Sequence, residues 1–161
     1  MKQELPPFSI EHFFAGYTQA WGVFEDRFGQ LRRSFRVDIE GENIENGIRL
    51  NEQFYYSDGT QDQRIWEIYP AGPQSYIGHA DDIIGCAKGH VSGTKLSWKY
   101  KMKLNIGGKQ ISVTFDDNMY LQSEGVMINI AKVRKYGVLL GTVTLFFCKQ
   151  PLESTDIEFL D

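Results

Sequence analysis

The sequence predicts an all-β fold: a single antiparallel up-and-down barrel of about eight to ten strands, with a short N-terminal helix plugging one end. From Gly16 onward, apolar and polar residues alternate with a period of two, which is typical of half-buried strands. Turn residues recur roughly every ten to twelve positions, as in a meander. The chain has 16 Gly and only 5 Pro, a balance that favours many strands joined by tight turns.

The length and composition favour one globular domain spanning residues 1–161. Apolar residues make up 42% of the chain and charged residues 24%, which argues against disorder. We expect the core to run over about 13–148, with frayed tails at 1–8 and 151–161. At this size the domain buries about two thirds of its unfolded surface and needs no disulfide or metal for stability.

The first predicted element is the helix. Pro6 and Pro7 end a polar lead segment, and Ser9 is a suitable N-cap for a short helix from Ile10 to Phe14. Because the alternation with a period of two begins directly after this segment, we expect the helix to cover one end of the barrel.

Ten strand candidates follow the helix. They run over Tyr17 to Asp26, Leu31 to Glu40, Gly47 to Tyr56, Gln61 to Tyr69, Gln74 to Ala80, Ile84 to Val91, Lys95 to Leu104, Gln110 to Asp116, Met119 to Ile130 and Val138 to Cys148. The turn Ser57-Asp58-Gly59-Thr60 predicts a hairpin between the third and fourth. The sixth is rich in glycine, which predicts a bulge.

A meander of this length tends to close, because closure removes the exposed strand edges. A barrel of eight to ten strands can hold one small ligand, or it can fill its own interior with side chains. A β-sandwich is the alternative architecture.

Charge and hydropathy exclude several partners. The net charge is −4, and the densest basic run, Lys95 to Lys103, alternates with apolar residues as the outer face of a strand does. We therefore expect no nucleic-acid partner. No stretch reaches about 18 apolar residues, so we expect no integral membrane segment. As written, the chain starts without a signal peptide and predicts a cytoplasmic protein; a removed leader would leave an envelope location open.

No enzyme signature is present in the sequence. It contains no Gly-x-Ser-x-Gly, no P-loop, and no dinucleotide-binding glycine motif followed by a helix. The three histidines, His12, His79 and His90, share no helical face, and Cys86 and Cys148 lack metal-ligand spacing. We therefore expect no metal and no cofactor.

Seven ordered segments resemble one family. They are RRSF (Arg32 to Phe35), LNEQF (Leu50 to Phe54), DGTQDQRIWEI (Asp58 to Ile68), GHADDIIGCAKG (Gly78 to Gly89), LSWKY (Leu96 to Tyr100), TFDDNMYLQ (Thr114 to Gln122) and KYGVLLGTVTLFF (Lys135 to Phe147). Together they resemble the bacterial domain-of-unknown-function family 3833. The resemblance covers nearly the whole chain, Phe13 to Phe147.

This resemblance implies a lipocalin-like (calycin) barrel of no established activity. Its members often lie near genes for membrane fatty-acid modification, which implies a lipid context. The chain departs from the family pattern at Asn118, where members usually have Trp, and it lacks the lipoprotein-type leader of many members.

Charged residues interrupt the apolar rows of three consecutive strands. Arg33, Glu52 and Arg64 each stand where the alternation requires a core residue. An isolated charge inside a protein costs several kcal/mol, so we expect these groups to be paired, hydrated or at the rim. Because antiparallel neighbours bring such side chains together, we predict an Arg33–Glu52–Arg64 cluster inside the barrel.

Other polar residues could complete this cluster. Four carboxylates could neutralise its excess positive charge: Asp81, Asp82, Asp116 and Asp117. Asn129 and His79 could extend the network. In one interpretation the cluster is a satisfied polar knot that fixes strand register. In another, an unbalanced guanidinium binds the carboxylate of a ligand, and the aromatic rows line a pocket for its apolar tail. Aromatic rows can equally be ordinary core.

The preferred function is non-enzymatic binding of a small apolar or lipid-like ligand, which is the expected partner. The candidate ligand-binding residues are Trp21, Arg33, Phe35, Glu52, Phe54, Arg64, Trp66, Trp98, Tyr100, Asp117 and Asn129. The alternative is an isomerase- or cyclase-type enzyme with Glu52 as its acid–base group, provided that burial raises the pKa of Glu52 against the effect of a neighbouring Arg. A further alternative is a filled barrel that binds a protein partner.

Overall fold

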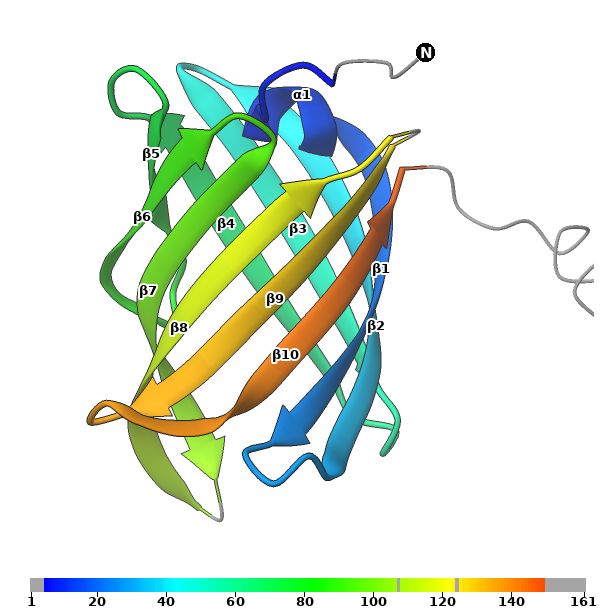
Figure 1. Cartoon of the computed structure of the whole chain (residues 1–161), viewed down its shortest axis with the longest axis vertical. Coiled ribbons are helices and arrows are strands. Elements are labelled where there is room, and N and C mark those ends of the chain that lie inside the picture. The colour runs from blue at the N-terminus through cyan, green and yellow to red at the C-terminus, as the bar shows by residue number, and fades with distance from the viewer. Residues whose placement is uncertain (1–4, 107, 124, 150–161) are drawn as a thin grey trace, which may run out of the picture.

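The computed structural model describes residues 5–106, 108–123 and 125–149. In this part of the chain, one helix precedes ten antiparallel strands that form a closed barrel (Figure 1). Each strand pairs with the next one in the chain, and β1 also pairs with β10 to close the ring. The predicted all-β up-and-down barrel is confirmed, and the sandwich alternative is excluded.

The helix and strands have the following bounds. The helix is α1 (Ile10–Phe14), and the strands are β1 (Gly16–Asp26), β2 (Leu31–Ile44), β3 (Gly47–Tyr56), β4 (Gln61–Pro70), β5 (Ser75–His79), β6 (Ile83–Ser92), β7 (Lys95–Ile106), β8 (Lys109–Leu121), β9 (Val126–Lys135) and β10 (Val138–Cys148). The hairpin predicted at Ser57 to Thr60 joins β3 to β4.

The boundary between β8 and β9 corrects the sequence analysis. Strand β8 does not end at Asp116 but continues to Leu121, and a turn closed by Gln122 N–H donating to Val126 O (2.8 Å) precedes β9. Asp and Asn are poor strand formers, so the run Asp116-Asp117-Asn118 resembles a strand end although the strand continues through it. Inside the strand they point to opposite faces: Asp117 is buried in the lumen, whereas Asp116 lies on the outside, across from Lys132 on β9.

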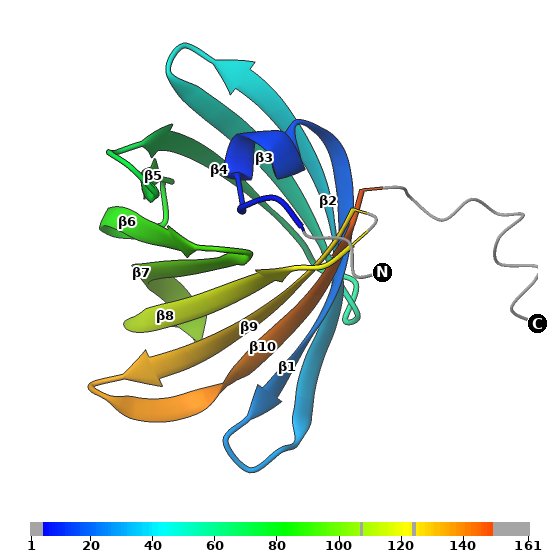
Figure 2. The ribbon, with the colours of Figure 1, turned by 45° about the horizontal axis from the view of Figure 1, so that its top comes forward.

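The end of the barrel that carries α1 is densely packed. Figure 2 shows α1 lying across this end, inside the ring of strands. The Oγ of Ser9 accepts a hydrogen bond from His12 N–H (3.2 Å), which confirms the predicted N-cap. The ring of Phe14 packs edge-on against Phe147 of β10, with ring centroids 5.8 Å apart. A Cβ at Gly41 of β2 would stand only 1.7 Å from the carbonyl oxygen of Phe14, so glycine allows this close approach.

The segment before α1 also belongs to this end. Phe8, which the sequence analysis assigned to a frayed tail, is 3% exposed, and its N–H donates to Gly93 O (2.8 Å) between β6 and β7. The lead segment is therefore packed against the barrel from Phe8 onward. Burial of the Phe8 ring removes apolar surface from water, which favours this arrangement over a solvated tail. The other predicted tail, residues 151–161, lies outside the described residues.

The opposite end of the barrel has an opening in its wall. Strand β5 has only five residues and pairs with β4 over Glu67–Pro70 alone. On that side, the first half of β4 lacks a neighbouring strand within the described residues. On the other side of the opening, β7 continues to Ile106 and stays paired with β8. The barrel is thus closed around its plugged half and incomplete at its other half.

Three further features concern the described part of the chain. Cys86 on β6 and Cys148 on β10 are not joined by a disulfide. Within the described ranges, no helix has the length and apolar character needed to span a membrane. The run Lys95 to Lys103 has its lysines on the outer face of β7 and its apolar residues Leu96, Trp98 and Met102 buried, as predicted.

Candidate ligand-binding site

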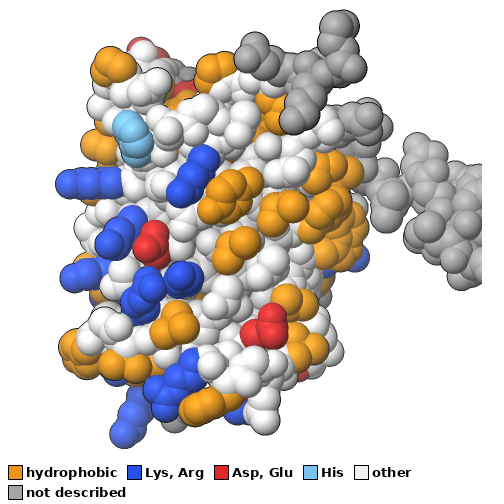
Figure 3. All heavy atoms as spheres, viewed as in Figure 1, with side chains coloured by type: hydrophobic (Ala, Val, Ile, Leu, Met, Phe, Trp, Pro, Cys, Tyr) orange, Lys and Arg blue, Asp and Glu red, His pale blue; other side chains and the backbone are white. Residues whose placement is uncertain are grey.

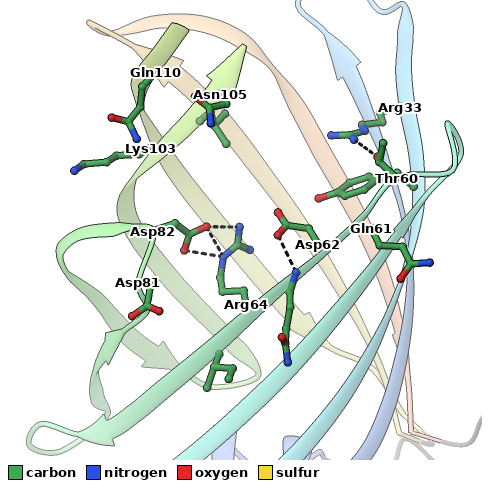
Figure 4. A pocket seen from close by; sticks show the side chains of 14 residues that line it. Arg33, Thr60, Gln61, Asp62, Arg64, Asp81, Asp82, Lys103, Asn105 and Gln110 are labelled. Atoms are coloured by element: carbon green, nitrogen blue, oxygen red, sulfur yellow. Dashed lines mark hydrogen bonds and ion pairs between the residues drawn. The ribbon is translucent and has the colours of Figure 1, made fainter. Parts of the chain in front are cut away.

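The lumen contains a cavity of about 420 Å³. Its volume lies in the usual range for small-molecule sites, roughly 300–1,000 Å³. A wider hollow of about 830 Å³ lies at the wall opening and shares several residues with the lumen, among them Arg64, Leu104 and Asn105. Figure 4 shows this opening, with Arg64 on β4 at one side and Lys103 and Asn105 of β7 at the other. The cavity is therefore continuous with the surface of the protein.

All the predicted binding residues except Trp21 line this cavity. The sequence analysis thus assigned the inward-facing side chains correctly on β2, β3, β4, β7, β8 and β9. The prediction for Trp21 is wrong. Its neighbours Ala20 and Gly22 occupy the inward row of β1, and Trp21 packs on the outer face against Phe146, with ring centroids 6.3 Å apart.

The outward-facing Trp21 belongs to a row of apolar side chains on the outside of the barrel. Trp21 stands beside Phe146 of β10, which stands beside Ile128 of β9, which stands beside Tyr120 of β8. Phe146 is 45% exposed. Figure 3 shows hydrophobic side chains grouped on this face. Strand β1 thus carries large apolar residues on both faces, so alternation alone does not reveal which face is buried.

Arg33 does not join the predicted ionic cluster. It lies in the inward row of β2 but at the rim, where Nη2 donates to Thr60 Oγ1 (2.9 Å) and lies 3.4 Å from Asp58 Oδ2. Its guanidinium carbon lies 3.5 Å from the centroid of the Tyr56 ring. Register explains the separation: Phe35 pairs with Tyr56, while Glu52 pairs with Ile39, farther along the strand.

Arg64 and Glu52 form the part of the cluster that the sequence predicts correctly. They are direct cross-strand partners, and Nη1 of Arg64 lies 3.9 Å from Oε1 of Glu52. The main partner of Arg64 is Asp82, one of the carboxylates predicted to neutralise it. Nε of Arg64 donates to both carboxylate oxygens of Asp82 (3.1 and 3.0 Å), and Nη2 donates to Oδ2 (2.9 Å).

The unbalanced guanidinium that the sequence suggested is therefore not observed at Arg64. Burial disfavours its charge, but the hydrogen bonds to Asp82 and the field of Glu52 raise the pKa of Arg64, so it stays protonated. The Arg64–Asp82 pair also bridges β4 and the segment between β5 and β6. It lies where the ladder between β4 and β5 has already ended.

Glu52 has the strongly shifted pKa that an acid–base role requires. Burial raises the pKa of Glu52 to about 7, although Arg64 and a hydrogen bond from Trp66 act in the opposite direction. Near neutral pH this side chain is thus present in both protonation states.

A second buried carboxyl lies on β8. Asp117 is 5% exposed and Asn129 of β9 is 2% exposed. Nδ2 of Asn129 donates to Oδ2 of Asp117 (3.2 Å), and the Tyr100 hydroxyl lies 3.5 Å from the same oxygen. Burial raises the pKa of Asp117 to about 7 despite these hydrogen bonds, and burial also raises the pKa of Tyr100, which keeps its proton.

Two acceptor atoms of this pair stay unsatisfied. Oδ1 of Asp117 and Oδ1 of Asn129 are buried and make no hydrogen bond to any described residue. Buried polar atoms in native proteins nearly always have a partner, and one left without it costs roughly 1–3 kcal/mol. Because both side chains line the cavity, their natural partners are groups that enter the lumen.

Aromatic rings form the wall between the two carboxyl groups. Trp66 and Tyr100 meet edge-on with centroids 5.4 Å apart, and Tyr100 stacks on Phe115 at 5.1 Å. Trp98 lies over the backbone of β5 and β6, where a Cβ at Gly78 or Gly89 would come within about 2.5 Å of its ring. Some of these rings thus belong to the ordinary core, which the sequence analysis gave as one possibility, and others form the cavity wall.

Sequence reasoning missed most of the apolar wall. The missed residues line the cavity from β8, β9 and β10 and include Met119, Val133, Val143 and Leu145. Inward parity was available as a signal for Met119, Val143 and Leu145, whereas Val133 lies beyond the predicted end of its strand at Ile130. His79 was expected to extend the polar network; it is exposed on the outer row of β5 because the buried residues of that strand are Tyr76 and Gly78.

The described residues offer no site for a metal. Among them, no group of three or more His, Cys, Asp or Glu side chains converges closely enough to hold an ion. Asp81 and Asp82 both line the outer hollow, but Asp82 is held by Arg64. The cavity thus offers a ligand two titratable carboxyl groups, an amide and a phenol among aromatic side chains.

Comparison with known families agrees with the fold and the motifs. The family model described as "Protein of unknown function (DUF3833)" matches residues 1–149. The chain belongs to this family. The DUF3833 assignment confirms the resemblance carried by the seven ordered segments, and Asn118, where the chain departs from the pattern, lies outside the lumen beside Ser97. No curated protein matches the sequence.

Proposed function

We propose that this protein binds a small apolar or lipid-like molecule in the lumen of the barrel without chemically transforming it. The observation that carries the proposal is the cavity of about 420 Å³, which is continuous with the surface and walled mainly by aromatic and aliphatic side chains. Closed antiparallel barrels of similar size, such as lipocalins, hold one small ligand in this way. The lipid context that the family resemblance implies supports a role in membrane lipid metabolism.

Gentle purification tests the proposal. We expect native mass spectrometry to show an extractable lipid on the protein, and added apolar ligands to change the fluorescence of Trp66 and Trp98, which line the cavity. If the native mass is that of the bare chain and fatty ligands leave the fluorescence unchanged, the proposal fails.

A pair of variants on β10 separates lumen binding from surface adsorption. Val143→Phe fills the cavity, since Val143 is an inward residue that lines it. Thr142→Phe makes the same change on the outer face one residue earlier, opposite Lys132. We expect loss of binding in the first variant and unchanged binding in the second. Equal affinities would mean that ligands adsorb outside the lumen.

A second candidate function is acid–base catalysis on a lipid-like substrate. The observation that favours it is the pKa of about 7 for Glu52, which suits a general acid or base near neutral pH. Under this alternative, Glu52→Gln keeps the fold and accumulates a bound substrate that the wild-type protein converts. Identical lipids extracted from the two proteins would exclude this alternative.

A further inference from the structure

The polar side chains in the deep part of the cavity indicate which head group the ligand carries. We propose that the lumen selects ligands whose polar end donates hydrogen bonds, an alcohol or an amine on an apolar chain, and discriminates against carboxylates. This inference rests on the proposed function, since it concerns the same cavity. It departs from the carboxylate head that the pattern of charges in the sequence suggested.

The cationic side chains that line the cavity already have carboxylate partners. Among the described residues that line it, the cationic side chains are Arg32, Arg33 and Arg64. Each one already has a carboxylate partner, at 2.7 Å from Asp26, 3.4 Å from Asp58 and 2.9 Å from Asp82 respectively. A ligand carboxylate would have to displace one of these partners to obtain a guanidinium fork.

The deep lumen is acidic. Glu52 and Asp117 both project into it, and Asp82 compensates Arg64. A ligand carboxylate would add a further negative charge to a poorly solvated region, where like charges repel most strongly. A neutral hydroxyl adds no charge, and an ammonium group adds the opposite one.

The two unsatisfied oxygens determine which polar groups can bind beside them. Oδ1 of Asn129 can only accept a hydrogen bond, because the Nδ2 of the same amide already donates to Asp117. Oδ1 of Asp117 accepts when the carboxyl is ionised and donates when it is protonated, since Oδ2 is the oxygen that accepts from Asn129 and Tyr100. A hydroxyl matches both states because it donates and accepts, and an amine matches the ionised state.

Ligands of one chain length test this inference. Calorimetric titration with decanol, decylamine, decyl methyl ether and decanoic acid compares a donor–acceptor head, a donor head, an acceptor-only head and a carboxylate. We expect decanol and decylamine to bind at least about tenfold more tightly than the ether and the acid, as one additional buried hydrogen bond provides. Tighter binding of decanol identifies a hydroxyl head, and tighter binding of decylamine identifies an ammonium head.

A matched pair of variants assigns the selectivity to the deep lumen. Asn129→Leu removes the acceptor at the deep site, and we expect it to reduce the preference for decanol over the ether to less than about threefold. Asn118→Leu makes the same change outside the lumen, where Asn118 lies beside Ser97, and should keep the preference.

The outcomes separate the two proposals. If none of the four ligands binds, lumen binding itself is wrong, and the inference falls with it. If the ligands bind but decanoic acid binds as tightly as decanol or more tightly, lumen binding stands and the head-group inference is overturned. The wild-type series alone gives this result, so the test does not depend on the folding of Asn129→Leu.

Discussion

The two halves of the barrel are built from the same strands but are packed in opposite ways. At the plugged end, Phe13 and Phe14 of α1 are 6% and 4% exposed, and glycine at position 41 lets the helix touch the backbone of β2. At the other end the wall between β4 and β7 is incomplete, and the lumen holds a cavity of about 420 Å³. The first half stabilises the fold, whereas the second keeps space and buried polar groups that a stable core would not retain.

This difference separates stability from binding along the barrel axis. Replacing a plug residue should lower the stability of the protein more than it changes ligand affinity. Replacing a cavity residue should change affinity or pH dependence more than stability.

The largest loss of stability is expected at the plug. Phe14→Ala removes a ring that is 4% exposed and packs against Phe147, which should lower the free energy of unfolding by about 3–5 kcal/mol. Phe35→Ala removes a ring that borders the existing cavity, so we expect a loss of only about 1–2 kcal/mol together with weaker ligand binding. Urea denaturation measures both values. Equal losses in the free energy of unfolding would mean that the two ends contribute equally to stability.

The buried acids make stability depend on pH. The folded-state pKa values of Glu52 and Asp117 are about 7, against ordinary values of 4.5 and 3.8. Between these values the folded protein binds more protons than the unfolded chain, so the free energy of unfolding falls as the pH rises from about 5 to 8. Each acid contributes roughly 2–3 kcal/mol to this fall and nothing further well above its folded pKa.

Asp117→Asn isolates one of the two acids. The amide resembles the protonated carboxyl and does not ionise, so the variant should be more stable than the wild-type protein at pH 8 by roughly 2–3 kcal/mol. Between pH 5 and 8, the free energy of unfolding of the variant should also fall less than that of the wild type, by a similar amount. Asp116→Asn is the matched control on the outer face, and we expect its pH profile to stay close to that of the wild type. A wild-type stability that rises from pH 5 to 8 would contradict the burial of the acids.

A smaller effect on stability is expected from the ion pair that bridges the wall opening. Asp82 is partly exposed, so Asp82→Asn should cost only about 1 kcal/mol. The same change releases the guanidinium of Arg64, so the affinity for decanoic acid should rise by about threefold to tenfold. Calorimetric titration measures this gain. An unchanged affinity for the acid would mean that Asp82 does not block Arg64 from ligands.

The smallest effect is expected at Trp21, the one predicted site residue outside the lumen. Trp21→Thr disrupts a cross-strand pair with Phe146 and should cost no more than about 1 kcal/mol. Ligand affinity should stay the same, because Trp21 does not line the cavity. A loss of affinity in this variant would point to a binding surface on the outer face.

The fold was predictable because local patterns determine it. Alternation, turn residues and strand number define a closed meander, and the inward positions of Glu52 and Arg64 followed from parity alone. The site was less predictable, because it depends on register and on position along the barrel axis. Arg33 has the predicted parity but lies at the rim, and Asp82 holds Arg64 through a loop whose path the sequence does not encode in a simple pattern. The unsatisfied oxygens of Asp117 and Asn129 emerge only from three-dimensional contacts.

A crystal structure with decanol bound tests the central claim most directly. We expect the alkyl chain to lie in the lumen between Phe35 and Leu145, with its hydroxyl within about 3 Å of Oδ1 of Asn129. Density for decanol on the outer face alone, or a lumen that collapses around its own side chains at saturating ligand, would contradict it.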